Sequence, residues 1–132
     1  MQHIEHIDHL SDADQCAIQE TMAEQVGTLR DAVKGRVIVG VERKHRNVVT
    51  LTLDAGKRVR IRDTDDCCAY GYVDGVNVNL VGAVVTDVTT EDGFERWFIL
   101  GESRPIAELN VSWGVGNYPY YMFGLEIQVE RD

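Results

Sequence analysis

The sequence contains few of the features that stabilise small secreted domains or anchor a chain in a membrane. Its 132 residues include three cysteines, an odd number that argues against a disulfide framework. No apolar run approaches the roughly 20 residues that a membrane-spanning helix needs. The N-terminus, MQHIEHIDHL, has neither a basic region nor an apolar stretch, so it does not resemble a secretory signal. We therefore expect a cytoplasmic protein in which thiols stay reduced.

Linkers, internal repeats and low-complexity segments are also missing from the sequence. The hydrophobic fraction of 44% and the charged fraction of 27% are ordinary for a soluble globular protein. A chain of this length is typical of one domain that folds without disulfide or metal staples. We therefore expect a single compact unit.

Basic residues are scarce outside one band of the chain. The net charge is −9, yet residues 34–62 contain nine basic residues against two acidic ones. Residues 1–33 contain seven acidic residues against one arginine, and residues 63–132 contain thirteen against three. This basic band between two acidic blocks could bind an anionic partner. Alternatively, the acidic blocks cover the band within the fold or across an interface, which would make the protein a homo-oligomer.

The first third of the chain has a helical pattern. Ser11 is a suitable N-cap, and aspartates in the following turn are favoured by the helix dipole. Gly27 followed by a threonine indicates a stop and a restart. We predict a helix over about 12–26 and a short helix over about 29–34. Their shared apolar stripe consists of Ile18, Met22, Val26, Leu29 and Val33.

From Arg36 onward the apolar period changes from that of a helix to that of a strand. Apolar and polar residues alternate over 37–42, 48–53 and 58–62, and similar segments follow to the end of the chain. The sequences VDGV and EDG between such segments are typical of hairpin turns. We predict an α+β fold, with the helices against a curved antiparallel sheet of about seven strands. Residues 1–27 would form a helical extension and residues 28–132 the β domain.

Three arginines lie on one face of the predicted strand over 58–62, and further basic residues occupy a neighbouring turn. The predicted ligand-binding residues are Arg58, Arg60, Arg62, Arg43, Lys44 and Arg46. The planar fork of arginine suits phosphate and carboxylate groups. Duplex nucleic acid is a poor candidate, because the net charge is negative and aromatic residues do not interleave with the basic ones. The alternative is that the arginines pair with acids of adjacent strands, namely Glu108, Glu126 and Glu130.

Two adjacent thiols, Cys67 and Cys68, follow a run of aspartates in DTDDCC. Neighbouring side chains on an extended strand point to opposite faces, so we expect one thiol in the core and the other at the surface. A shared metal ion and a disulfide are then both disfavoured. The alternative is a metal or reactive-thiol site that includes Asp66, although the spacings CxxC and DxDxDG are absent. No base can be placed beside either thiol, so no catalytic residue is predicted.

Three histidines, His3, His6 and His9, recur at every third position near the N-terminus. Two of them, with Glu5 or Asp8, could bind zinc or nickel, although the HExxH pattern of metalloproteases is absent. The alternative is a polar face on a segment that docks through its apolar face. That apolar face would consist of Ile4, Ile7 and Leu10.

Two longer segments carry a family resemblance. LTLDAGKRVRIRDTDDCC joins a hairpin to a strand and an Asp-Cys-Cys step, and ELNVSWGVGNYPYYMFGLEI turns from a Trp-ended strand into a Tyr-Tyr strand. Over about Leu29 to Glu130 the chain resembles an uncharacterised family of small, largely phage-encoded domains with this Asp-Cys-Cys signature. The family often places an acid directly after the second cysteine, where this chain has Ala69. The resemblance implies a fold and a phage origin, and no activity.

Together these patterns predict a non-catalytic phage accessory protein that acts in the host cytoplasm as a homo-oligomer. It would bind a host protein or a small anionic ligand through the basic strand, without a cofactor. The first alternative is a metal-binding protein or metal-dependent enzyme that holds zinc or another divalent ion through the Asp-Cys-Cys segment or the N-terminal histidines. The second alternative is a structural component of the virion.

Overall fold

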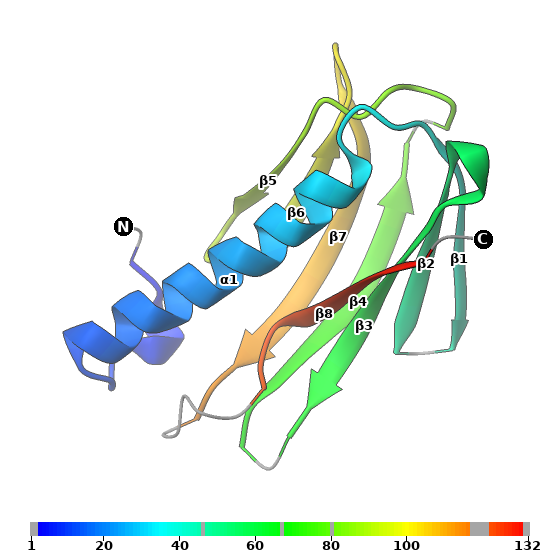
Figure 1. The fold of residues 1–132 in the computed structure, drawn as a ribbon. Helices are drawn as coiled ribbons and strands as arrows, with labels where there is room; N and C mark the ends of the chain where they lie inside the picture. The colour runs from blue at the N-terminus through cyan, green and yellow to red at the C-terminus, as the bar shows by residue number, and fades with distance from the viewer. Residues whose placement is uncertain (1–2, 46, 67, 80, 117–121, 131–132) are drawn as a thin grey trace.

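The computed structural model describes residues 3–45, 47–66, 68–79, 81–116 and 122–130. One long helix packs against a set of antiparallel strands (Figure 1). The helical elements are η1 (Glu5–Ile7), α1 (Asp12–Val33) and η2 (Asp54–Gly56), of which η1 and η2 are short 3-10 turns. The strands are β1 (Ile38–His45), β2 (Val48–Leu53), β3 (Arg58–Asp65), β4 (Tyr70–Val78), β5 (Asp87–Glu91), β6 (Arg96–Leu100), β7 (Pro105–Gly114) and β8 (Leu125–Glu130).

The strands form one bent sheet in the order β1-β2-β3-β4-β7-β6-β5, with β8 paired to β3 beside this path. Strand β3 belongs to both halves of the sheet, since Arg58–Asp63 pair with β8 while Thr64 and Asp65 pair with β4. A bridge between Val37 and Val84 joins the residue before β1 to the segment before β5. The predicted α+β class and antiparallel sheet are confirmed, and the described residues contain eight strands rather than about seven.

Helix α1 begins where the sequence predicts and continues through the predicted break. The Ser11 side chain accepts a hydrogen bond of 3.1 Å from the backbone N–H of Asp14, as an N-cap does. The predicted stop at Gly27 is wrong, and the expected second helix is the last part of α1. A glycine inside a helix costs only about 1 kcal/mol relative to alanine. Burial of Val26 and Leu29 on the core-facing side of the helix offsets that cost.

Replacing Gly27 with alanine should raise the free energy of unfolding by about 0.5–1 kcal/mol, because alanine restricts the unfolded chain and favours the helix. Apart from its chain neighbours and the helix backbone, a Cβ atom at this position would meet no heavy atom within 4 Å, so the change introduces no clash. Urea denaturation followed by circular dichroism measures the effect. A loss of stability would contradict a continuous helix at this position.

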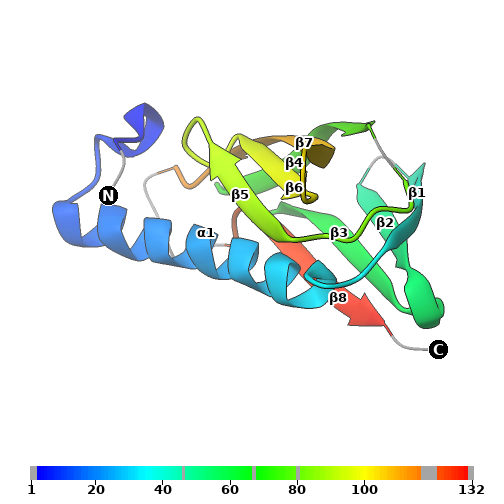
Figure 2. The ribbon, with the colours of Figure 1, turned by 90° about the horizontal axis from the view of Figure 1, so that it is seen from above.

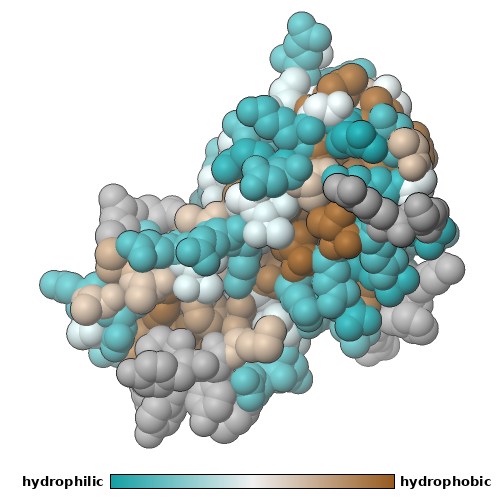
Figure 3. Space-filling model, in the orientation of Figure 1, coloured by the Kyte–Doolittle hydropathy of each residue, from teal (hydrophilic) through white to brown (hydrophobic). Residues whose placement is uncertain are grey.

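The core lies between the two halves of the sheet and is closed by α1, which contacts β5, β8 and β3 (Figure 2). Its largest fully buried side chains come from both the helix and the strands, and include Ile18, Met22, Leu29, Leu51 and Trp97. Residues before position 28 therefore contribute to the same core as the β domain. On the face drawn in Figure 3, hydrophilic side chains cover much of the surface and apolar ones form separate patches. Within the described residues, no helix has the length and apolar character that crossing a membrane requires.

Candidate anion-binding groove

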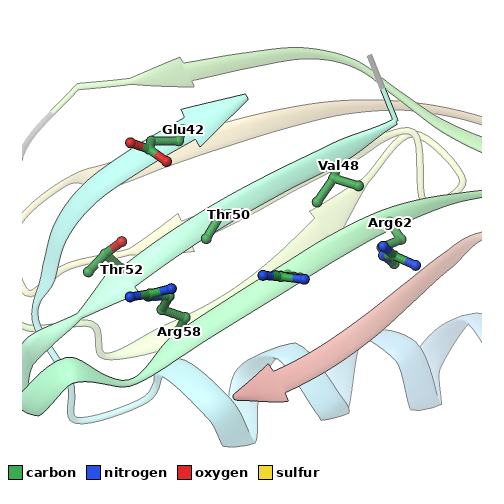
Figure 4. Close-up of a pocket in the computed structure, with 7 residues that line it drawn as sticks. Glu42, Val48, Thr50, Thr52, Arg58 and Arg62 are labelled. Atoms are coloured by element: carbon green, nitrogen blue, oxygen red, sulfur yellow. The ribbon is translucent and has the colours of Figure 1, made fainter. Parts of the chain in front are cut away.

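The outer face of β1, β2 and β3 forms a groove with a volume of about 550 Å³. Its lining consists of Glu42 from β1, Val48, Thr50 and Thr52 from β2, and Arg58, Arg60 and Arg62 from β3 (Figure 4). Strand alternation produces this lining, because the intervening residues point into the core. The buried residues between them are Val49, Leu51, Leu53, Val59 and Ile61.

The three arginines, called the arginine row from here on, have different neighbours on their two sides. Towards β2, the residues directly opposite Arg58, Arg60 and Arg62 are Thr52, Thr50 and Val48. Towards β8, the opposite residues are Glu130, Gln128 and Glu126. The arginine row thus has an uncharged flank that belongs to the groove and an acidic flank on β8.

Part of the arginine row is paired with the acids of β8, as one reading of the sequence predicts. The Nη1 atom of Arg60 lies 3.2 Å from Oε1 of Glu130. The Nε atom of Arg62 is shielded from solvent and has no hydrogen-bond partner among the described residues. Glu108, the third acid considered as a partner, instead accepts a hydrogen bond of 3.1 Å from Arg96.

The other basic residues predicted for this site lie elsewhere or outside the described part of the chain. The Nη2 atom of Arg43 donates a hydrogen bond to the carbonyl of Val73 on β4, so Arg43 does not line the groove. The side chain of Lys44 and the whole of Arg46 are not among the described residues. Of the six predicted ligand-binding residues, the structure places three together, and these are the members of the arginine row.

The groove also contains residues that the sequence did not indicate as part of a binding site. Thr50 and Thr52 of β2 contribute hydroxyl groups beside the arginine row, and Glu42 of β1 contributes a carboxylate across from it. The alternation in VVTLTL indicated that both threonines face outward. The sequence carried no signal for the register that sets these threonines beside the arginines.

Asp66 and Cys68 of the Asp-Cys-Cys segment lie between β3 and β4. The backbone N–H of Asp66 donates a hydrogen bond of 2.9 Å to the carbonyl of Ala69, which closes a tight turn. Cys68 is exposed and lies in this turn rather than on a strand, where the sequence interpretation had placed it. Cys67 lies outside the described residues. The predicted division of the two thiols between core and surface therefore stays a prediction. A side-chain oxygen of Asp66 accepts a bond of 3.4 Å from the backbone N–H of Met122.

The other aspartates of this region are engaged separately. Asp63 accepts a hydrogen bond of 2.9 Å from the backbone N–H of Val73. Burial raises the pKa of the Tyr72 phenol, and the nearby carboxylate of Asp65, which accepts its hydrogen bond, raises that pKa further. Within the part of the chain that the structure describes, no three histidine, cysteine, aspartate or glutamate side chains gather in a group that could hold a metal ion.

The three N-terminal histidines make three different contacts. The Nε2 atom of His3 lies 2.7 Å from a carboxylate oxygen of Asp8. The ring of His6 meets the edge of Trp113, with 4.4 Å between ring centroids. His9 donates a hydrogen bond of 2.7 Å to a backbone carbonyl in the segment after β7.

The N-terminal segment docks on the sheet through its apolar side. Ile4, directly before η1, and Ile7, the last residue of η1, are buried in the core. Partial burial lowers the pKa of His6, and the positive field of His9 adds to this effect while Glu95 opposes it. The histidines thus accompany a docked segment, which is the alternative that their apolar neighbours indicated.

Comparison with known proteins identifies the family to which this domain belongs. A family model described as a domain of unknown function (DUF7448) matches residues 31–127, a range that begins in the last turn of α1 and ends within β8. No curated protein and no solved structure matches the chain. The matched range contains all the described residues that line the groove. Because the match spans well over half of the sequence, the chain belongs to the DUF7448 domain family.

Proposed function

We propose that this protein is a non-catalytic binding protein that holds an anionic ligand in the groove over β1, β2 and β3. The observation that carries the proposal is the arginine row, in which three guanidinium groups line one hollow of about 550 Å³. This volume lies within the range of pockets that bind small molecules. Arginine is suited to such a site because its fork donates two parallel hydrogen bonds to a carboxylate or phosphate.

The remaining lining supports binding rather than chemistry. The groove combines three positive charges and one negative charge with the hydroxyls of two threonines. Neither a histidine nor a thiol is among its described lining residues to serve as base or nucleophile. The family resemblance implies a phage origin. The proposed protein is therefore a phage accessory protein that binds a ligand or a protein in the host cytoplasm.

The variant R58Q/R60Q/R62Q tests this proposal. Charge-assisted hydrogen bonds contribute about 1.5–3 kcal/mol each, so the variant should bind anions at least about tenfold more weakly than the natural chain. Calorimetric titration with pyrophosphate, with citrate and with a glutamate-rich peptide measures the affinity. Added salt should also weaken binding, because the groove is open to solvent.

The control variant is R104Q, which removes one exposed arginine between β6 and β7. It should bind all three anions as the natural chain does, and circular dichroism should show that both variants keep their fold. Binding by R58Q/R60Q/R62Q with natural affinity would reject the groove as the site. Failure of the natural chain to bind any of the three anions would reject the proposed function.

A further inference from the structure

The arginine row has a regular repeat that restricts which ligand can contact all of it. Alternate residues of a strand lie about 6.6 Å apart along its axis, so the row from Arg58 to Arg62 spans about 13 Å. A compact anion can reach one or two of these guanidinium groups at a time. A chain with negative groups at the same repeat can reach all three.

The molecule itself contains an extended segment with acidic side chains at both ends of that span. On β8, Glu126, Gln128 and Glu130 occupy alternate positions and stand opposite Arg62, Arg60 and Arg58 of the arginine row. The ion pair between Arg60 and Glu130 shows that a glutamate on a neighbouring extended segment reaches a guanidinium of the row. An extended acidic segment is therefore complementary to the row in both charge and spacing.

We propose that the groove accommodates an extended peptide segment of a partner protein, in which acidic side chains at alternate positions contact Arg58, Arg60 and Arg62. This inference rests on the proposed function and specifies its ligand. The hydroxyls of Thr50 and Thr52 lie on the groove side of the row and offer hydrogen bonds to the same carboxylates or to the peptide backbone.

Single-stranded nucleic acid is the competing chain with regularly spaced negative charges. Proteins that bind it combine a basic groove with aromatic side chains on which successive bases stack. The described lining of this groove contains no aromatic residue. An acidic peptide needs no such platform, so the composition of the groove favours the peptide.

The glutamates of β8 compete with the ligand for the arginine row. The side chains of Arg60 and Glu130 are 36% and 40% exposed, and an ion pair at such a position contributes little stability. A guanidinium has five N–H donors, so one carboxylate does not exhaust its hydrogen-bonding capacity. Neutralising the acids of β8 should therefore strengthen the binding of an acidic peptide without unfolding the protein.

The first experiment compares two blocked heptapeptides by calorimetric titration of the full chain. In one peptide three glutamates alternate with threonines, and in its isomer the three glutamates are contiguous. In an extended isomer only two glutamates face the row, and loss of one charge-assisted bond should weaken binding about tenfold. Equal affinity for both peptides would overturn the inference. Oligothymidylate that binds more tightly than the alternating peptide would overturn it in favour of nucleic acid.

The second experiment uses E126Q/E130Q, which should bind the alternating peptide several-fold more tightly. The control E24Q/E102Q removes the same charge from two exposed glutamates outside the groove lining, and it should leave the affinity nearly unchanged. Equal effects of the two variants would overturn the role assigned to β8. Binding of pyrophosphate that depends on the arginine row, without preference for the alternating peptide, would reject this inference and leave the proposed function standing.

Discussion

Replacing Gly71 with alanine should destabilise the fold by about 3 kcal/mol or more, at the upper end of the costs of overpacking. A Cβ atom at Gly71 would lie 1.6 Å from the carbonyl oxygen of Gly124 and 2.2 Å from its carbonyl carbon. Both are backbone atoms, so no side-chain rotation relieves the clash. Gly71 is also paired with Thr64 on β3 and with Trp113 on β7, which prevents β4 from moving aside.

A matched control for this change lies on the same strand. At Gly75 an added Cβ would lie 3.5 Å from the side-chain nitrogen of Asn110, an ordinary contact. Gly75→Ala should change the free energy of unfolding by less than about 1 kcal/mol. Urea denaturation of both variants measures the difference. Gly71→Ala with the stability of the natural chain would contradict the close approach of β4 to the start of β8.

Replacing Gln25 with leucine should lower the free energy of unfolding by about 2–4 kcal/mol, because two partly buried backbone groups lose their partners. The side-chain amide of Gln25 on α1 donates a hydrogen bond of 2.9 Å to the carbonyl of Phe123. Its oxygen accepts a hydrogen bond of 2.7 Å from the N–H of Leu125. One side chain thus satisfies the backbone on both sides of Gly124 and ties the helix to the start of β8.

Two further variants separate these hydrogen bonds from helix propensity and packing. In Gln25→Glu the carboxylate still accepts from Leu125 but cannot donate to Phe123, so we expect a substantial loss of stability at neutral pH. Glu24→Leu alters the adjacent exposed position, where the effect should stay within about 0.5 kcal/mol. Denaturation curves of the three variants measure the order of their free energies of unfolding. A Gln25→Leu protein as stable as Glu24→Leu would show that the amide does not hold β8.

Patterns confined to one element were readable from the sequence. Ser11 caps α1 as its hydroxyl predicts, and the alternation in RVRIR places Val59 and Ile61 in the core with arginines outside. The predicted break at Gly27 failed because local propensity is a weak preference. Packing of the helix on β5 and β8, which no local pattern encodes, keeps the helix continuous.

Only part of the candidate site could be predicted from the sequence. Its arginine row follows from strand alternation, whereas the groove depends on which strands lie beside β3. Pairing of β3 with β8 joins residues more than sixty positions apart, and the register of that pair decides which glutamate faces which arginine. The contacts of His6 and His9 likewise depend on docking against β7 and the segment after it, which the histidine spacing does not reveal.

The most direct test of the groove as the binding site is a map of backbone amide shifts during titration of the full chain with the alternating glutamate peptide. We expect the largest shifts in residues 48–52 of β2 and 58–62 of β3, and their loss in R58Q/R60Q/R62Q. Shifts confined to the N-terminal histidines or to the turn that holds Cys68 would place the ligand elsewhere and reject the groove as the binding site.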